Sequence, residues 1–517
     1  MKRMFCGGWR VSGLIGLMLA GSAQALDMPA VYNGSLDQPR VNMIIRLPGQ
    51  MDPLDGQGID LPLPIPIPGL GGPTWNIEGF LDTGASSILI APAIAAPDEF
   101  NIPLEDGWLF EDVGVASTPT PFHITQPLEI RIAPYNFYVD IDNPPNPGVP
   151  NDPANYNYFN TVYNHAYYDM RAIVGPISHT TPVSQTPLDE LADLLSQVNV
   201  FGMPLFKDKV AVFDARGLNS FVLSGDGWLG MEDPDAFPML QTYLYEPGTP
   251  FKEGTINFDP GIPQTQYHIR TSYADFTRFT RVTGDGAEMP SFAHNPFIGA
   301  NPVNVLEGIP DDTPGITLGR DGQQATGSFL FDTGAAATII STHLAEQLNI
   351  RYKPGQEPGT DNGPRLQRLV GDTWVDLSDF EQFELTIGGI DGTVQIAGFI
   401  LDSFSVPTVE GEPLNFADVP VLVFDVGTSD PLTGDTIILD GIFGMNMLFA
   451  TMFIDEPLDL FGLLDAPMTP GAFDWVTFDE RTGIIGLSLD PRVIIPEPAT
   501  GVLLVTAGAM VLMRRRH

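Results

Sequence analysis

The stretch Gly79-Phe80-Leu81-Asp82-Thr83-Gly84-Ala85-Ser86 ends an apolar run in the tripeptide Asp-Thr-Gly. The same tripeptide ends a second apolar run, Ser328-Phe329-Leu330-Phe331-Asp332-Thr333-Gly334-Ala335-Ala336. An apolar run bounded by turn residues is typical of a buried strand, which leaves the polar residues after it at the rim of the core. Because the two settings match and Asp332 follows Asp82 by 250 residues, we expect two similar lobes that each supply one carboxylate to a shared site.

A second pair of matching segments lies further along each half. Val198–Phe206 reads VNVFGMPLF and Asp440–Phe449 reads DGIFGMNMLF, each with an apolar pair directly before a glycine, Gly202 or Gly444. The spacing from the Asp of the tripeptide to this glycine is 120 residues in the first half and 112 in the second. Two matched landmarks at nearly equal spacing favour a duplicated unit.

Between these landmarks, each half has an alternating pattern that predicts a β-hairpin. In the first half it runs over Leu128–Ile132 and then Phe137–Val139; in the second, over Phe383–Ile387 and then Val394–Ile400. Alternation of apolar and polar residues around Gly-rich turns is the usual hairpin signal. Each half therefore predicts a strand, the Asp-Thr-Gly turn, further strands, and an apolar-Gly strand.

Helix signals are few. Pro187–Gln197 has Thr186 as N-cap, proline at the first helical position and leucines on one face. Ser341–Leu348, directly after the second tripeptide, predicts another short helix. The 49 prolines and 54 glycines divide the rest into short pieces, which indicates a mainly β protein.

The N-terminal residues 1–25 have the three parts of a secretory signal. Lys2 and Arg3 precede an apolar stretch, and Ala23-Gln24-Ala25 is a small-residue cleavage site. We expect export and a mature chain that starts at Leu26. The one cysteine, Cys6, lies in the signal, which excludes disulfides and thiolate chemistry from the mature protein.

The C-terminus carries a second targeting pattern. Pro496-Glu497-Pro498 precedes the uncharged stretch Ala499–Met513 and then Arg514-Arg515-Arg516. As a helix the stretch covers roughly 22 Å, less than the roughly 30 Å hydrocarbon core of a bilayer. The tail resembles the PEP-CTERM sorting signal of Gram-negative bacteria. That resemblance implies transient membrane contact, cleavage by an exosortase-type enzyme, and delivery to the cell envelope, cell surface or extracellular matrix.

The formal net charge is −40. Such a chain repels nucleic acid and anionic membranes, so neither is an expected partner. Either adaptation to an exposed or saline setting or function at low pH, where carboxylates take up protons, accounts for this charge.

Other catalytic and metal signatures are absent from the sequence. The seven histidines are scattered, and neither His-Glu-x-x-His nor Gly-x-Ser-x-Gly occurs. Two acidic loops lack the spacing of an EF-hand and are better explained as solvated turns. These loops are Gly225-Asp226-Gly227 with Glu232, Asp233 and Asp235, and Asp311-Asp312. We therefore predict no cofactor and no metal site.

The duplicated tripeptide has a direct chemical interpretation. Two carboxylates within hydrogen-bonding distance cannot both ionise cheaply, so they share one proton. The ionised group deprotonates a water while its protonated partner donates to a substrate carbonyl oxygen. Glycine permits the tight turn, and the threonine hydroxyl can hydrogen-bond across to the other lobe.

Through these tripeptides and the Gly202 and Gly444 segments, residues 30 to 490 resemble the pepsin-like and retropepsin-like aspartic proteases. The resemblance implies a mainly β, bilobal double-β-barrel fold with a few short helices, a monomer, and a cleft for a peptide or protein substrate. It implies Asp82 and Asp332 as the catalytic pair. The supporting residues that it implies are Thr83, Gly84, Thr333 and Gly334.

The resemblance also has departures. Pepsin-like enzymes usually have a hydroxyl residue after the glycine, whereas this chain has Ala85 and Ala335, as retroviral-type enzymes do. Loss of a donor to the ionised carboxylate raises the apparent pKa values of the pair, so we expect a mildly acidic optimum. No pepsin-type flap is identifiable; Tyr135 or Tyr138, near the hairpin that starts at Leu128, are the candidates.

The expected organisation is a signal peptide (1–25), an N-terminal lobe (26–260), an inter-lobe connection (261–300), a C-terminal lobe (301–492) and a sorting tail (493–517). The expected function is an exported aspartic endopeptidase. The alternative is an inactive relative at the surface or in the matrix that binds peptide or polysaccharide. The separation of the Asp82 and Asp332 carboxyl groups, or a cleft plugged by the Pro-rich segment Leu61–Pro73, distinguishes the two.

Overall fold

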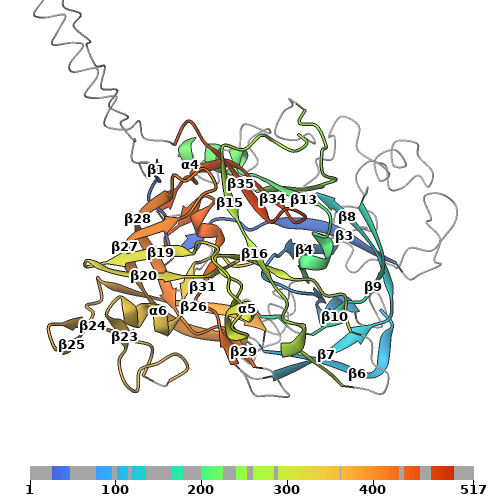
Figure 1. Ribbon diagram of the computed structural model, residues 1–517. Helices are drawn as coiled ribbons and strands as arrows, with labels where there is room; N and C mark the ends of the chain where they lie inside the picture. The colour runs from blue at the N-terminus through green and yellow to red at the C-terminus, as the bar shows by residue number, and fades with distance from the viewer. Residues whose placement is uncertain are drawn as a thin grey trace, which may run out of the picture.

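The computed structural model confirms the mainly β class (Figure 1). The residues that it describes are 26–46, 77–95, 102–113, 119–134, 165–175, 177–178, 199–224, 240–252, 260–283, 289–360, 362–390, 392–429, 436–454 and 467–493. Several predictions lie outside these ranges: the signal and almost all of the tail, the helix over Pro187–Gln197, the strand Phe137–Val139, the Pro-rich Leu61–Pro73, and the first acidic loop.

The first half of the chain forms a ten-stranded sheet in which the strand before Asp82 is central. Its strand order is β17-β6-β7-β10-β5-β12-β4-β3-β8-β9. The bounds are β3 (Arg40–Arg46), β4 (Ile77–Leu81), β5 (Ile88–Ile90), β6 (Leu104–Val113), β7 (Pro119–Thr125), β8 (Leu128–Pro134), β9 (His165–Met170), β10 (Ile173–Val174), β12 (Asn199–Phe201) and β17 (Arg281–Thr283). The predicted strand at Leu128 is β8, which pairs with both β3 and β9.

Strands mainly from the second half form a twelve-stranded sheet around the strand before Asp332. Its main path is β11-β26-β27-β28-β22-β31-β21-β18-β16, with β1, β19 and β20 attached. The bounds are β1 (Leu26–Asp27), β11 (Ile177–Ser178), β16 (Ser272–Ala274), β18 (Asn295–Ile298), β19 (Ile316–Arg320), β20 (Gln323–Gly327), β21 (Phe329–Phe331), β22 (Ile339–Ile340), β26 (Gln382–Ile390), β27 (Gly392–Val406), β28 (Leu414–Val423) and β31 (Gly441–Phe443). The hairpin predicted over Phe383–Ile400 is confirmed as β26 and β27.

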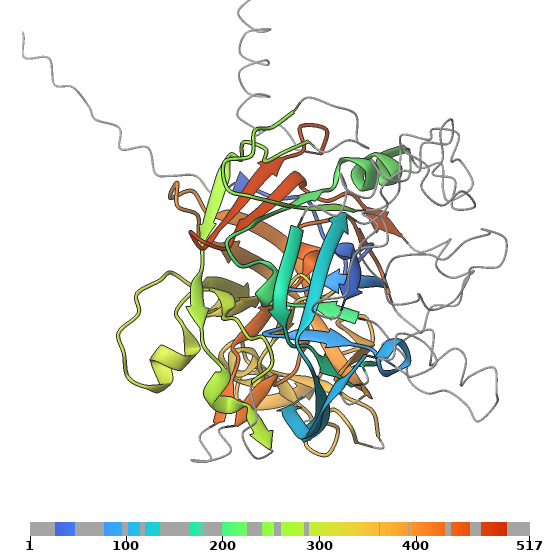
Figure 2. The same cartoon turned by 90° about the vertical axis from the view of Figure 1, so that its right-hand side faces the viewer.

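A five-stranded sheet joins the two halves. Its order is β14 (Gln241–Tyr245), β13 (Val210–Asp214), β34 (Phe473–Asp479), β35 (Ile484–Leu489) and β15 (Tyr267–Arg270). Strands more than 250 residues apart in the chain meet where β13 pairs antiparallel with β34, labelled in Figure 1. In Figure 2 the red C-terminal strands of this sheet lie at the top. The core is continuous through this sheet, because the ring of Phe331, beside Asp332, lies 5.6 Å from that of Phe478 on β34.

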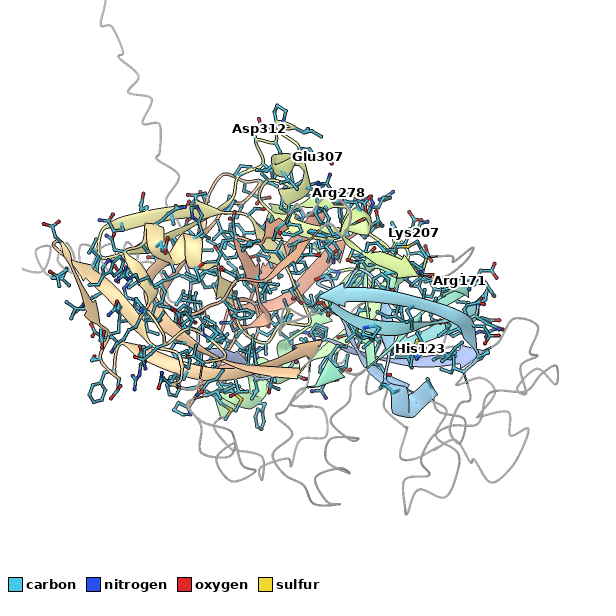
Figure 3. The ribbon with its side chains drawn as sticks, turned by 90° about the horizontal axis from the view of Figure 1, so that it is seen from below. His123, Arg171, Lys207, Arg278, Glu307 and Asp312 are labelled. Carbon is cyan, nitrogen blue, oxygen red and sulfur yellow. The ribbon has the colours of Figure 1, made fainter. Side chains whose placement is uncertain are left out.

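The stretch 261–300, expected as a connection, supplies strands to all three of these sheets: β15, β16, β17 and β18. The stretch 261–300 also contacts α5 (Pro302–Leu306) and the loop after this helix. Figure 3 shows Arg278 close to Glu307 and Asp312 of that loop, and Arg278 Nη1 is 2.6 Å from Glu307 Oε1.

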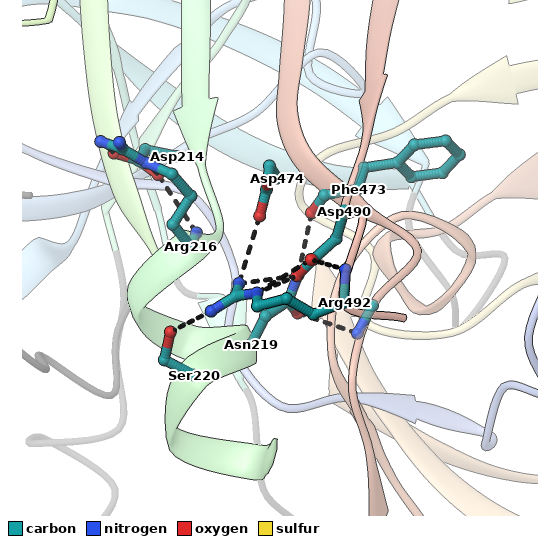
Figure 4. Close-up of polar contacts among 9 residues, drawn as sticks. Asp214, Arg216, Asn219, Ser220, Phe473, Asp474, Asp490 and Arg492 are labelled. Atoms are coloured by element: carbon teal, nitrogen blue, oxygen red, sulfur yellow. Dashed lines mark hydrogen bonds and ion pairs between the residues drawn. The ribbon is translucent and has the colours of Figure 1, made fainter. Parts of the chain in front are cut away.

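Polar side chains fasten α4 (Arg216–Ser224) to the C-terminal strands (Figure 4). Asn219 Nδ2 donates to Phe473 O at 3.0 Å, and Arg492 Nη1 donates to Ser220 Oγ at 2.6 Å. Burial and the neighbouring charge of Asp490 raise the pKa of Asp474 to about 7. This cluster secures the joint between the halves away from the Asp-Thr-Gly turns.

The remaining elements are small. The helix predicted over Ser341–Leu348 is confirmed as α6 (Thr342–Gln347), whose N-cap Ser341 accepts a hydrogen bond from Leu344 N. Among the described residues, no helix combines the length and the apolar character needed to cross a bilayer. The other elements are β2 (Gly34–Ser35), β23 (Ile350–Tyr352), β24 (Leu366–Val370), β25 (Thr373–Asp376), β29 (Gly427–Ser429), β30 (Thr436–Ile438), β32 (Thr451–Met452), β33 (Met468–Thr469), α1 (Pro92–Ala95), η1 (Met203–Leu205), η2 (Thr277–Phe279) and η3 (Met445–Met447).

Candidate active site

Each aspartate leaves the end of a strand that is held on one side by the apolar-Gly strand. In the first half β12 runs parallel to β4, and in the second β31 runs parallel to β21. Asp82 N donates to Phe201 O at 3.0 Å, and Asp332 N donates to Phe443 O at 3.2 Å. The apolar-Gly strands therefore fix the point at which each aspartate emerges from its sheet.

The register around the two turns is the same in both halves. Leu89 on β5 is opposite Val200 and Ile173, just as Ile339 on β22 is opposite Ile442 and Leu422. The two halves thus repeat one four-stranded unit, β4-β12-β5-β10 and β21-β31-β22-β28. The duplicated sequence pattern therefore corresponds to a duplicated structural unit.

The glycines of the apolar-Gly segments are required by close backbone packing. A Cβ at Gly202 would meet the main chain of Ala85 and Ser87, and one at Gly444 would meet that of Ala337. The residues that follow donate back to the turns, Met203 N to Ala85 O and Met445 N to Ala335 O, each at 2.8 Å. These segments therefore hold the loops that carry the aspartates.

The carboxyl groups of Asp82 and Asp332 lie within hydrogen-bonding reach of each other across the two halves. Backbone groups of each turn also bind them: Gly84 N donates to Asp82 Oδ1 at 2.6 Å, and Gly334 N donates to Asp332 Oδ1 at 2.9 Å. Ala335 N donates to the same Asp332 oxygen at 3.0 Å. The structure therefore brings the two predicted aspartates together in one site.

The two carboxyl groups titrate as a pair. Burial and the charge of Asp82 raise the pKa of Asp332 well above its usual value. Burial also raises the pKa of Asp82, but hydrogen bonds from Asp332 and from the backbone of Gly84, Ala85 and Gly334 oppose that rise. One proton is therefore shared by the pair, and the apparent pKa values belong to both groups together.

Thr83 and Thr333 lock the two turns together. Thr83 N donates to Thr333 Oγ1 at 3.0 Å, and Thr333 N donates to Thr83 Oγ1 at 3.1 Å. Each hydroxyl in turn donates across the interface, Thr83 Oγ1 to Phe331 O at 2.5 Å and Thr333 Oγ1 to Leu81 O at 2.6 Å. Both side chains are fully buried, so these four bonds form without competition from water.

We predict that Thr333→Val destabilises the whole chain. Valine keeps the shape but removes the donor to Leu81 O and the acceptor for Thr83 N, which leaves buried polar groups unpaired. The free energy of unfolding should fall by about 2 to 4 kcal/mol. Urea titration measures it, with Thr333→Ser, which keeps the hydroxyl, as the control. If valine and serine variants unfold at the same urea concentration, the lock contributes no stability.

Gly84 and Gly334 lie directly against the opposite aspartate. A Cβ at Gly84 would lie 2.6 Å from both carboxylate oxygens of Asp332, and one at Gly334 would lie 2.8 Å from Asp82 Oδ1. All six predicted site residues thus occupy one place. The absence of a side chain at these two positions is what allows the carboxyl groups to approach.

Two residues that the motif does not contain also reach these turns. The side-chain amide of Gln38 donates to Gly334 O. Asn295 Nδ2 donates to Gly84 O at 2.9 Å and to Thr83 O at 3.1 Å. In the sequence each amide stands at the start of a strand-like run. No local pattern shows that this run pairs with the strand that leads into an Asp-Thr-Gly turn.

The remaining sequence candidates do not form a second site in the described ranges. Asp311 Oδ2 accepts from Asn301 N at 2.8 Å, and its Oδ1 accepts from Thr313 N at 3.0 Å, so this acidic loop closes its own turn. Across the residues that the structure describes, no group of three or more His, Cys, Asp or Glu side chains is arranged to hold a metal ion. The flap candidates Tyr135 and Tyr138 lie outside those residues.

Comparison with known proteins supports the same chemistry over part of the chain. Residues 316–387 match the model of a family described as aspartyl protease. The match runs from β19 into β26 and contains the second turn. No curated protein matches the chain. The stretch around Asp332-Thr333-Gly334 is therefore similar to the aspartyl proteases, and its geometry is repeated around Asp82.

Proposed function

We propose that this chain is an exported aspartic endopeptidase, which hydrolyses peptide bonds with a water activated between Asp82 and Asp332. The observation that carries the proposal is the close pairing of two buried carboxyl groups, each at the end of an equivalent strand in one of two matching four-stranded units. A binding protein that had lost catalysis has no need for this costly pairing of buried carboxyl groups.

We assign the ionised role to Asp82, because backbone N–H groups of three residues bond its carboxyl group and those of two residues bond that of Asp332. Asp82, ionised, takes a proton from water, whose oxygen attacks the peptide carbonyl carbon while Asp332 gives its proton to the carbonyl oxygen. In the tetrahedral intermediate, Asp332 takes a hydroxyl proton back and Asp82 protonates the leaving nitrogen as the C–N bond breaks. The pair ends with one proton on Asp332, as it began, and no covalent intermediate forms.

The pH–rate profile of peptide hydrolysis tests this proposal. The reaction needs one ionised and one protonated carboxyl group, so kcat/KM should fall both below the lower and above the upper apparent pKa. Burial raises the pKa of both groups, and alanine follows each glycine instead of a hydroxyl donor. We expect a maximum at about pH 5 to 6, above the midpoint of the pepsin pair, whose values are about 1.5 and 4.7.

A maximum below about pH 4 contradicts the predicted effect of Ala85 and Ala335, because it places the pair in the pepsin range. A flat profile contradicts the two-carboxyl mechanism itself. Binding of peptides or polysaccharides without hydrolysis at any pH supports the alternative, an inactive surface or matrix protein.

Export and sorting are a further part of the proposal, supported by the patterns at residues 1–25 and 493–517. We propose that the tail is processed by an exosortase-type enzyme and that the body is delivered to the envelope, surface or matrix of a Gram-negative bacterium. Mass spectrometry of the mature chain should show an N-terminus at Leu26 and loss of the residues after the Pro-Glu-Pro motif. An intact tail on the exported protein contradicts the sorting proposal.

A further inference from the structure

We propose that Gln38 and Asn295 are positioning residues that hold the backbone of each Asp-Thr-Gly turn against its own aspartate; this inference rests on the proposed function. The two amides occupy equivalent places. Arg40 on β3 is opposite Phe80, and Phe297 on β18 is opposite Leu330. Gln38 lies two residues before Arg40, and Asn295 lies two residues before Phe297. The two amides therefore belong to the duplicated unit.

The two amides cross between the halves. Gln38 precedes a strand of the Asp82 sheet but donates to Gly334 O in the second turn. Asn295 begins a strand of the Asp332 sheet but donates to Thr83 O and Gly84 O in the first turn. Asn295 is 2% exposed, and its Oδ1 accepts from Ser86 Oγ. The amides are therefore a second reciprocal connection, outside the threonine lock.

Both amides are themselves held in place. The buried Asp37 carboxylate accepts from Gln38 N and from Leu240 N, each at 2.9 Å. The backbone also bonds the segment before each amide to the facing turn, Ser35 N to Ala336 O at 2.8 Å and Ala293 N to Ser86 O at 3.0 Å. Their side chains thus reach the turns from anchored backbone.

The accepting carbonyls belong to the peptide units that bind the aspartates. Asn295 donates to Thr83 O, and the N–H of the same peptide unit is Gly84 N, which donates to Asp82 Oδ1 at 2.6 Å. Asn295 also donates to Gly84 O, whose peptide unit supplies the Ala85 N–H to Asp82. A hydrogen bond to the carbonyl of a peptide polarises its N–H and strengthens the bond that this N–H donates.

Gln38 acts in the same way on the second turn, where it donates to one peptide carbonyl. It donates to Gly334 O, and the N–H of that peptide unit is Ala335 N, 3.0 Å from Asp332 Oδ1. Asn295 therefore supports two N–H groups on Asp82, while Gln38 supports one on Asp332. This difference favours the charge on Asp82 and the proton on Asp332.

The test compares Asn295→Leu with the unchanged chain in peptide hydrolysis across pH. Weaker donors to the Asp82 carboxylate should move the acidic limb of the kcat/KM profile upward by about 0.5 to 1 pH unit. We expect kcat to fall about 10-fold with KM nearly unchanged, because the side chain acts through the turn and not on the substrate.

The matched control is Asn301→Leu, which removes another largely buried amide of the same segment. Asn301 caps α5 by accepting from Val303 N, and its Nδ2 donates to Tyr273 O. This variant should lose stability but keep the pH profile. Equal profiles for Asn295→Leu and the unchanged chain overturn the inference, as does the same limb shift in Asn301→Leu.

A second readout does not depend on activity. Carboxyl ¹³C NMR of the labelled full chain, with Asp82→Asn to assign the signals, follows the titration of the pair directly. The lower apparent pKa should rise in Asn295→Leu. If the unchanged chain cleaves no peptide at any pH, the proposed function fails, while this titration still decides the positioning role. If Asn295→Leu does not fold, Gln38→Met serves instead, with an upward shift of the upper pKa expected and an unchanged titration contradicting the inference.

Discussion

Asp82→Asn and Asp332→Asn will each abolish peptide hydrolysis, with kcat falling by a factor of about 10⁴. In the proposed mechanism the pair works with one proton and one charge, and an amide can neither remove the proton from water nor donate a proton and later take it back. Loss in both single variants indicates one shared site. A fluorogenic peptide assay at the pH optimum of the unchanged chain measures the effect.

The same variants should fold normally. Asparagine has the shape of aspartate, and the substitution removes one of two carboxyl groups that oppose each other's ionisation. The thermal midpoint should therefore stay the same or rise. Asp402→Asn, at an exposed position on β27, is the matched control and should keep full activity. Substantial hydrolysis by either dyad variant ends the proposal of a two-aspartate mechanism.

Gly84→Ala should have the second largest effect, a fall in kcat of about 10² or more. The added Cβ would lie 2.6 Å from both carboxylate oxygens of Asp332, a distance that forces the turns apart. The carboxyl groups would separate, and the shared proton would no longer be held between them. The reacting water could then no longer contact both carboxyl groups at once. Kinetic constants at several pH values measure both the lost rate and the change in the profile.

Gly322→Ala is the control for glycine replacement in general. Gly322 has a φ of +77° in the turn between β19 and β20, and no atom lies near its missing Cβ. Alanine there should cost stability, about 1 kcal/mol, without affecting catalysis. Retention of full kcat by Gly84→Ala would show that the turns do not need to approach as closely as this structure places them.

Local patterns predicted much of what surrounds the aspartates. The apolar runs before Asp82 and Asp332 form strands, the alternating run over Phe383–Ile400 forms the hairpin of β26 and β27, and Ser341 begins a helix. Each depends on residues that are neighbours in the chain, where period and capping decide the structure. The flap and the terminal segments stay predictions, since they lie outside the described residues.

Long-range pairing was beyond these patterns. β13 and β34 are more than 250 residues apart in the chain and still adjoin in the sheet that joins the halves. The strands within 261–300 were expected only as a connection, although they serve three sheets. Alternation reveals which residues face a core, but it carries no information about which distant strand lies alongside.

By itself, the sequence determined the duplicated Asp-Thr-Gly turns, their apolar strands, and the glycines that permit a tight turn, because these depend on local geometry and residue size. The tertiary structure alone decided that Asp82 and Asp332 lie together and largely buried, and that the amides of Gln38 and Asn295 donate to carbonyl groups of the turns. Those properties depend on burial and on contacts between residues 212 to 296 positions apart in the chain. They arise only when the two halves of the chain pack against each other.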